Sequence, residues 1–202
     1  MDTDDPVGGG DLSHHEGIRM GTLADLDALV SLEAACFSDP WSKRSFEAEL
    51  HGNSFSQILV IPGPKEQPEI PLLGYICVWV IFEETRFLNL AVHPHYRGQG
   101  LAKQLILQAL CIGIAQGCCR GMLEVRNSNQ VAKGLYERFQ FTEYGRRSSY
   151  YTNPSEDAIL MVLDPISKFQ SDKMDHLGIS GECQVRTLPS STITTNKGGH
   201  RW

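Results

Sequence analysis

NLAVHPHYRGQGLAK, residues 89–103, runs from an apolar strand end through a Pro-centred turn into the glycine-bearing start of an amphipathic segment. Such a turn between a strand and a helix exposes backbone N–H groups that the helix cannot use itself. Those donors, together with the helix dipole, suit the oxygens of a phosphate group. Gly98, Gly100 and Ala102 are small, so a ligand can approach the backbone closely. The stretch therefore predicts a strand, an anion-binding turn and a helix, in that order.

Two familiar phosphate-binding motifs fit this turn poorly. A Walker A loop is excluded because no Gly-Lys-Ser/Thr follows at the required spacing. A Rossmann fingerprint has Gly or Ala where this chain has Lys103, and Glu124, the nearest downstream acid, falls at a strand end. A glycine-bearing helix start without any ligand is the remaining alternative when the turn is taken alone.

The pattern Arg97-x-x-Gly100-x-Ala102 resembles the Arg/Gln-x-x-Gly-x-Gly/Ala signature of the GNAT acetyltransferases. Downstream, LEVRNSN (residues 123–129) and LYERFQF (residues 135–141) are similar to RimI-type members of that family, bacterial enzymes that acetylate the N-terminal alanine of a ribosomal protein. The resemblance covers about residues 18–164. It implies an α/β (α+β) fold with a mixed, mostly antiparallel sheet of about seven strands, splayed at the acetyl-CoA site and flanked by about four helices.

Composition bounds the domain organisation. The chain has 202 residues, 41% of them hydrophobic and 21% charged, which is typical of one globular domain. We expect this domain at 18–164, between a disordered acidic tail at 1–17 and a polar, disordered tail at 165–202. The net charge of −6 argues against nucleic-acid binding and is compatible with a basic peptide substrate.

Cysteine usage and hydropathy indicate a cytoplasmic protein. The six cysteines form no Cys-x-x-Cys pair and most lie in apolar patterns, as expected of buried thiols in a reducing compartment. The chain lacks a basic-then-apolar leader, and the apolar run at 75–82 is too short to cross a bilayer. His93 and His95 flank a proline without an evident third ligand, so we expect no metal.

Periodicity and turn signals predict the order of the elements. Strands are expected at 17–20, 55–61, 72–83, 85–92, 118–125, 141–151 and 158–163. Helices are expected after Thr22, after Ser42, and at about 99–116 and 130–139, the last one capped by Asn127 or Ser128. In that last helix, Gly134 stands where a better helix former would be expected. Gln140 replaces the glycine that usually ends this helix in the family.

Transfer of an acetyl group to an amine needs a base for the amine and a proton for the departing thiolate. Glu124 matches the glutamate that the resemblance implies as general base; its alternative role is a surface acid paired with Arg126 or Arg120. Tyr136, with a phenolic O–H, matches the general acid; its alternative is a core aromatic. Both roles rest on the resemblance.

The resemblance also implies the residues that hold acetyl-CoA. Leu90, Ala91 and Val92 would pair with the pantetheine amides as a strand does. Asn129 matches a CoA-contacting asparagine of the family. The residues of the pyrophosphate-binding turn are Arg97, Gly98, Gln99, Gly100, Leu101, Ala102 and Lys103.

The acceptor residues come from two parts of the chain. Pro40 and Trp41 resemble a wall of the peptide groove, and Trp41 could equally anchor the core between two helices. The C-terminal strands supply further candidates, although an ordinary hairpin with aromatic cross-strand pairs would look the same. These candidates are Arg146, Tyr150, Tyr151 and Glu156, with Asp157 as the alternative to Glu156.

The sequence thus predicts an enzyme that transfers acetyl from acetyl-CoA directly to a protein N-terminal α-amine, foremost the N-terminal alanine of a small-subunit ribosomal protein. One alternative keeps the chemistry and changes the acceptor to a small-molecule amine. Another is a non-catalytic CoA-binding regulatory module.

Overall fold

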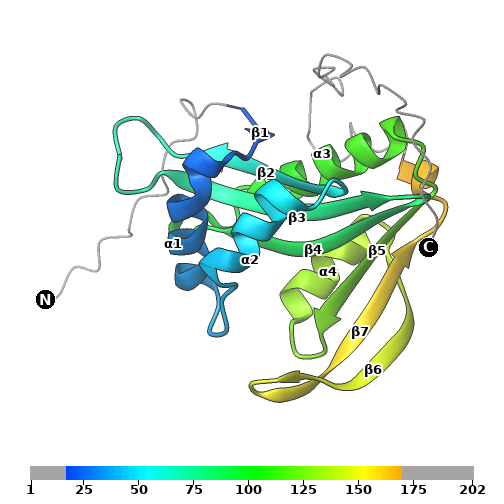
Figure 1. Cartoon of the computed structure of the whole chain (residues 1–202). Helices are drawn as coiled ribbons and strands as arrows, with labels where there is room; N and C mark the ends of the chain where they lie inside the picture. Colours follow the sequence, from blue (N-terminus) through cyan, green and yellow to red (C-terminus); the bar gives the residue numbers. More distant parts are fainter. Residues whose placement is uncertain (1–16, 170–202) are drawn as a thin grey trace, which may run out of the picture.

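A seven-stranded sheet with the strand order β1-β2-β3-β4-β5-β7-β6 organises the computed structural model, which describes residues 17–169 (Figure 1). Every neighbouring pair of strands is antiparallel except β4 and β5, which are parallel. The expected mixed, mostly antiparallel sheet is therefore confirmed. The strands are β1 (Arg19–Met20), β2 (Ser56–Pro62), β3 (Leu72–Ile81), β4 (Glu84–Val92), β5 (Arg120–Arg126), β6 (Thr142–Thr152) and β7 (Ser155–Leu163).

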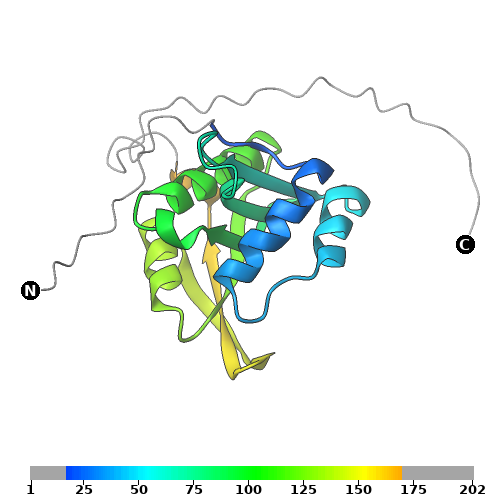
Figure 2. The same cartoon turned by 90° about the vertical axis from the view of Figure 1, so that its left-hand side faces the viewer.

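Four α-helices within the described residues cover the sheet, which confirms the expected number. They are α1 (Leu26–Cys36), α2 (Lys43–Glu47), α3 (Leu101–Ala115) and α4 (Gln130–Arg138). Leucines of α1 and Phe46 of α2 share one apolar cluster with β2 and β3. Residues of α3 and α4 share a second cluster with the other side chains of the same strands. The sheet is thus the middle layer, with α1 and α2 side by side on one face (Figures 1 and 2).

The sheet opens between β4 and β5. The two strands pair only from Glu84↔Arg120 to Phe87↔Leu123. Leu88 is an extra residue against β3, where the register shifts between Cys77 and Val78, and such a bulge bends its strand. Among the described strands, residues 88–92 of β4 consequently have no partner on the β5 side. The expected splay is present, and it lies directly before the glycine turn.

Short turns complete the described chain. Two 3-10 turns, η1 (Leu23–Asp25) and η3 (Pro94–Tyr96), lead into α1 and into the glycine turn, respectively. A π turn, η2 (Ala48–Gly52), follows α2 directly. Ser42 caps α2 as predicted, because its hydroxyl accepts from the Ser45 N–H at 3.1 Å. None of the helices within residues 17–169 is long and apolar enough to cross a membrane.

The start of α4 corrects one prediction. Asn129 is the N-cap, and its Oδ1 accepts from the Ala132 N–H at 3.0 Å, so the prediction of Asn127 or Ser128 is wrong. Ser128 is instead occupied by Glu156 of β7, which accepts from its backbone N–H and from its hydroxyl. The Asn127 N–H donates to the Asp157 carbonyl at 3.1 Å. Two residues that lie 28 and 30 positions later in the chain thus bind Ser128 and Asn127, and the third polar residue, Asn129, is the cap.

The C-terminal boundary of the domain, predicted at residue 164, also needs correction. Residues 166–169 form the 3-10 turn η4 (Ile166–Phe169). Ile166 is 2% exposed and belongs to the second apolar cluster, the one that α3 and α4 share with the sheet and that we call the α3-side core. Its N–H donates to the Cys119 carbonyl at 2.6 Å. The packed domain thus extends past 164, and the expectation of disorder is wrong for these first residues. The rest of the expected C-terminal tail, and residues 1–16 of the N-terminal one, lie outside the described part of the chain.

Candidate active site

The glycine turn has the geometry of an anion cradle. Gly98 and Gly100 have φ values of 78° and 85°, a left-handed conformation that favours glycine. Apart from the adjacent residues, no atom of residues 17–169 lies within 4 Å of where a Cβ would stand at either position, so the space above the backbone is open. The first intrahelical bond of α3 runs from Gln104 N–H to the Gly100 carbonyl at 3.1 Å. The N–H groups of residues 101–103 precede it and have no helical acceptor.

The end of β4 is held against this turn. Arg97 donates through Nε to the Val92 carbonyl at 3.2 Å, and Cys36 of α1 donates through Sγ to the same oxygen at 3.4 Å. Leu90 and Ala91 pair with β3 on one side only and face the splay on the other. An unpaired strand edge beside a phosphate-sized cradle suits a ligand that carries both amides and a diphosphate.

Glu124 lies at the β5 side of the splay. Its neighbours Leu123 and Val125 belong to the α3-side core, so the carboxylate points to the face covered by α1 and α2. Arg147 of β6 approaches Glu124 Oε1 to 2.8 Å through Nη1. Tyr150 also hydrogen-bonds this carboxylate, and that bond raises the pKa of the Tyr150 phenol.

The alternative pairing of Glu124 with Arg126 or Arg120 is not observed in the described chain. Arg126 approaches Glu156 to 3.6 Å, and Arg120 approaches Glu83 to 3.9 Å. Arg147 was not predicted from the sequence, because a register shift between Glu143 and Gly145 changes which side chains of β6 lie on the same face of the sheet as Glu124. Two consecutive arginines before an aromatic pair were the available signal, and the bulge decides which of them reaches the carboxylate.

Tyr136 lies on α4, buried in the α3-side core. Its ring makes edge contacts with Phe87 and Phe141 at centroid distances of 6.5 and 5.7 Å. Burial, with Tyr151 nearby, raises the pKa of the Tyr136 phenol well above its usual range. The phenol therefore keeps its proton at neutral pH. Phe87 is the last β4 residue paired with β5, so the Tyr136 ring packs where the splay begins.

The end of α4 explains how Tyr136 is positioned without the usual glycine. Gln140 itself adopts φ 67°, in the left-handed region. The Gln140 N–H donates to the Glu137 carbonyl at 2.8 Å, and the Phe141 N–H donates to the Tyr136 carbonyl at 3.1 Å. This is the bond pattern of a Schellman motif, with the Tyr136–Phe141 contact as its apolar closure.

The predicted acceptor aromatics lie near Glu124. Tyr150 and Tyr151 have ring centroids 5.2 Å apart, and the Arg126 guanidinium lies 4.0 Å from the Tyr151 centroid. Tyr151 is half-buried, whereas Tyr150 is exposed. Trp41 packs its ring on Phe46, with centroids 5.5 Å apart, and follows the exposed Pro40 in the connection between α1 and α2.

Two predicted acceptor residues have other partners. Arg146 pairs with Glu143, three residues earlier on the same exposed strand, at 2.7 Å. Glu156 is engaged by Ser128 and Arg126, and the Ser128 backbone N–H is the largest cause that lowers the pKa of this carboxyl. Asp157 accepts from the Ser149 N–H at 2.9 Å. The structure thus brings Tyr150 and Tyr151 to Glu124 and gives Arg146 and Glu156 contacts elsewhere.

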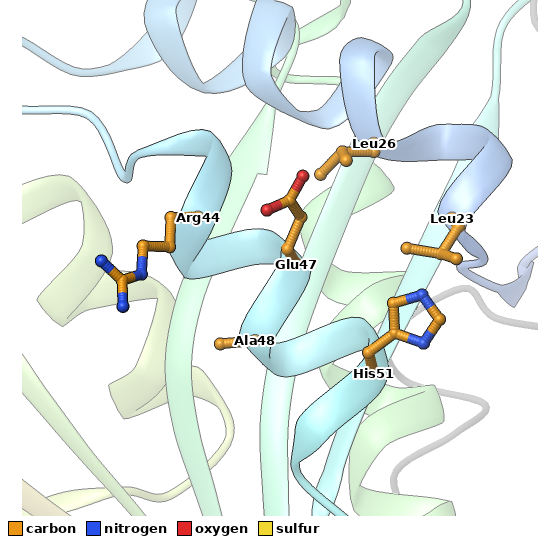
Figure 3. A pocket seen from close by; sticks show the side chains of 6 residues that line it. All are labelled: Leu23, Leu26, Arg44, Glu47, Ala48 and His51. Carbon is orange, nitrogen blue, oxygen red and sulfur yellow. The ribbon is translucent and has the colours of Figure 1, made fainter.

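A shallow hollow beside α2 has no features of a reaction site. It is lined by two leucines of η1 and α1 and by residues of α2 and η2 (Figure 3). Glu47 points toward Leu26 and His51 toward Leu23, whereas Arg44 points away from the others.

No group of three or more potential metal ligands occurs among residues 17–169. Of the cysteines in that range, Cys119 is exposed, so the expectation of buried thiols does not hold for it.

Comparison with known proteins settles the family. The sequence model of the Acetyltransferase (GNAT) family matches residues 26–141, more than half of the chain. This chain belongs to the GNAT acetyltransferase family. The resemblance that rests on residues 97–141 is thereby confirmed.

Relatives within the GNAT family narrow the likeness to the RimI type. A candidate ribosomal protein bS18-alanine N-acetyltransferase of Bacillus subtilis is 37% identical over 144 residues, which span 71% of this chain and 92% of the relative. The crystal structure of the ribosomal-protein-S18-alanine N-acetyltransferase from Escherichia coli has a TM-score of 0.66 at 28% identity, covering 74% of this chain and 93% of that one. A NatC complex bound to Gag peptide and CoA includes a chain that is 27% identical, with a TM-score of 0.62 and coverages of 74% and 99%.

Proposed function

We propose that this protein acetylates the N-terminal α-amine of a protein, using acetyl-CoA, and that its acceptor is the N-terminal alanine of the small-subunit ribosomal protein bS18. The observation that carries the proposal is the juxtaposition at the splay: Glu124, bonded by Tyr150, follows directly after the last β4–β5 pair, Phe87↔Leu123, and the Tyr136 ring packs on Phe87. The names of the bacterial relatives support the acceptor. Such an acceptor places the reaction in the cytoplasm.

Residues of this chain fit the co-substrate. Gly98 and Gly100 leave the backbone open to a diphosphate, and the first-turn N–H groups of α3 are free to donate to it. Leu90, Ala91 and Val92 would bind the pantetheine arm along the open edge of β4. Asn129 uses Oδ1 as the helix cap, and its amide N–H groups are not part of that bond. Acetyl-CoA bound in this way supplies an activated acetyl thioester.

Glu124 accepts a proton from the acceptor amine, directly or through a water. A peptide α-amine has a pKa of ~7.7 to 8.0, so it needs only modest assistance near neutrality. The Tyr136 hydroxyl donates the proton that the departing sulfur requires, and its raised pKa keeps that proton in place beforehand. One proton leaves the amine and one reaches the sulfur, so the protons balance. The acetyl group passes directly from CoA to the amine, without an acetylated side chain.

The acceptor is tested with a matched set of amines. Purified protein and acetyl-CoA are incubated with a peptide that carries the bS18 N-terminus, with the same peptide already N-acetylated, and with a panel of polyamines and aminoglycosides. We expect mass spectrometry to show one added acetyl group on the free N-terminal alanine alone. Turnover on the small amines alone contradicts the protein acceptor, and CoA binding without any turnover indicates a regulatory module.

The residue roles are tested by Glu124→Gln and Tyr136→Phe. Each substitution removes one proton-transfer group, so we expect kcat to fall by about 10²-fold or more, in the range of general acid–base catalysis. Calorimetry should give a CoA dissociation constant within about twofold of wild type for both, because neither side chain lies in the diphosphate turn. Wild-type turnover in either variant contradicts the role assigned to that residue.

A further inference from the structure

A carboxylate that the chemistry above does not use is buried beside the splay. Glu33 of α1 is 1% exposed, yet its two oxygens accept three hydrogen bonds from three other segments. Oε1 accepts from the Trp41 N–H at 2.9 Å and from Asn89 Nδ2 at 3.0 Å, and Oε2 accepts from the Tyr75 hydroxyl. A buried carboxylate is costly unless such donors satisfy it, so this site is built around the charge.

The first donor belongs to the connection between α1 and α2. The Trp41 backbone is bound by Glu33, while the Trp41 ring packs on Phe46 at 5.5 Å. Phe46 in turn makes an edge contact with Tyr75, also at 5.5 Å, and Tyr75 donates to Glu33. The segment of Pro40 and Trp41 is therefore held by the Trp41 backbone and by the Trp41 ring, and both sets of contacts connect it to the Glu33 carboxylate.

The second donor belongs to the splayed part of β4. Asn89 lies just past the Leu88 bulge, where β4 has lost its β5 partner. Ala91, two residues on, packs in the α1-side cluster, so Asn89 faces the same side. Glu124 on β5 also points to that side. Glu33 thus connects the Trp41 segment to the β4 side of the opening between β4 and β5. Glu124 lies on the β5 side of the same opening.

We infer that Glu33 is a positioning residue for the acceptor: it fixes Trp41 and Asn89 so that the acceptor amine enters the splay in line with Glu124. This inference rests on the proposed function, because it assumes that the α1–α2 connection forms a wall of the acceptor groove. The diphosphate turn lies outside the network, since none of the three donors to Glu33 belongs to residues 97–103. Loss of Glu33 should therefore affect the two substrates unequally.

The decisive variant is Glu33→Gln. The amide has nearly the same size but no charge, and it offers one acceptor oxygen where three donors converge, so the Tyr75 bond must reverse or break and the other two bonds lose their charge assistance. We expect KM for the acceptor to rise roughly tenfold to a hundredfold, as when a hydrogen bond to a charged group is lost. KM for acetyl-CoA should stay within about twofold, because the diphosphate turn is untouched. A purely structural role would alter stability without splitting the two KM values.

Glu49→Gln is the matched control. Glu49 is likewise a carboxylate with tryptophan and asparagine donors, the Trp79 indole Nε1–H at 2.7 Å and the Asn53 side-chain amide at 3.3 Å, but these contacts lie away from the splay. We expect both KM values of this variant to equal those of wild type. A second test variant, Asn89→Ala, removes one donor and leaves the carboxylate in place, so the inference can be judged even if Glu33→Gln does not fold. It should raise the acceptor KM roughly tenfold, the lower end of the effect of losing one hydrogen bond to a charged group.

The outcomes separate this inference from the proposed function. Acceptor KM is measured with whichever amine the wild type acetylates, and thermal unfolding confirms that each variant is folded at the assay temperature. If that amine is small and its KM still rises selectively, Glu33 keeps its positioning role and only the protein acceptor is wrong. An unchanged acceptor KM in the folded variants, or equal changes in both KM values, overturns the role of Glu33. A wild type that acetylates no amine overturns both.

Discussion

Gln140 adopts a left-handed backbone at φ 67°, a conformation that costs a residue with a Cβ about 1 kcal/mol relative to glycine. The chain accepts this because two backbone bonds and the Tyr136–Phe141 contact determine the end of α4. Strain at one residue is thus part of how the proposed proton donor is held.

Replacing Gln140 by glycine should relieve that strain. We expect Gln140→Gly to raise the free energy of unfolding by about 1 kcal/mol, because glycine reaches this conformation without a steric cost. Urea denaturation measures the change. Gly117→Ala is the reciprocal control: Gly117 follows α3 with φ 85° and open space around it, so alanine there should be destabilising through backbone strain alone. A destabilised Gln140→Gly would mean that the Gln140 side chain contributes more than its backbone costs.

At the scale of elements, two helices carry an interior glycine for different reasons. Gly113 of α3 packs on β4 so closely that a Cβ would lie 1.9 Å from Thr85 Oγ1. Thr85 is fully buried and has little room to move. Gly134 of α4 has nothing within 4 Å of the same position. One glycine permits a close approach of helix and sheet, and the other only weakens its helix.

The same substitution should therefore have opposite signs in the two helices. Gly134→Ala should stabilise by up to ~1 kcal/mol through helix propensity. Gly113→Ala should destabilise by roughly 1 to 3 kcal/mol through overpacking. Thermal unfolding of both variants measures the signs.

Thr85→Ala supplies the control for the clash. If the contact with Thr85 causes the loss, Gly113→Ala should cost less in the Thr85→Ala background than in wild type, because neighbouring sites that share a contact are not additive. Equal costs in the two backgrounds would assign the loss to another contact of α3.

At the scale of the whole molecule, two buried phenols link folding to alkaline pH. Burial raises the pKa of Tyr75 and of Tyr136, and Glu33 beside Tyr75 adds to the effect. The folded state thus keeps protons that the unfolded chain releases above about pH 10. Their contribution to stability is complete below that pH and is lost as the pH rises above it.

We expect the free energy of unfolding to fall above about pH 10 by up to ~1.4 kcal/mol per pH unit for each of these tyrosines. Denaturant titrations at a series of pH values on both sides of that point measure the slope. Tyr136→Phe should have a shallower slope than wild type, because one of the two protons is gone. Tyr144→Phe is the control, since this exposed tyrosine should leave the slope unchanged. A stability that stays flat into the alkaline range contradicts the linkage.

Much of this organisation could be predicted from local sequence. The glycine turn, the cap of α2 by Ser42 and the end of α3 at Gly117 rest on the conformations of a few neighbouring residues. The order of the elements along the chain was predicted from hydrophobic periodicity and turn signals, and the mixed sheet was implied by the family resemblance. Strand ends were displaced by a few residues, because hydrogen bonding to a neighbouring strand decides where pairing stops.

The remaining errors involve residues whose partners are distant in the chain. Asn129 caps α4 because Glu156 occupies Ser128, and Ile166 joins the core because Cys119 and α3 are there to receive it. No local pattern of either residue reports such a contact.

The sequence by itself determined the family, the glycine turn and the order of the elements, because glycine conformation, helix capping and hydrophobic period are properties of short segments. Only the tertiary structure decided that Arg147 pairs with Glu124, that Gln140 takes the place of a glycine, and that Glu33 joins three segments. These features depend on strand register, bulges and packing, and those are determined by residues far apart in the chain.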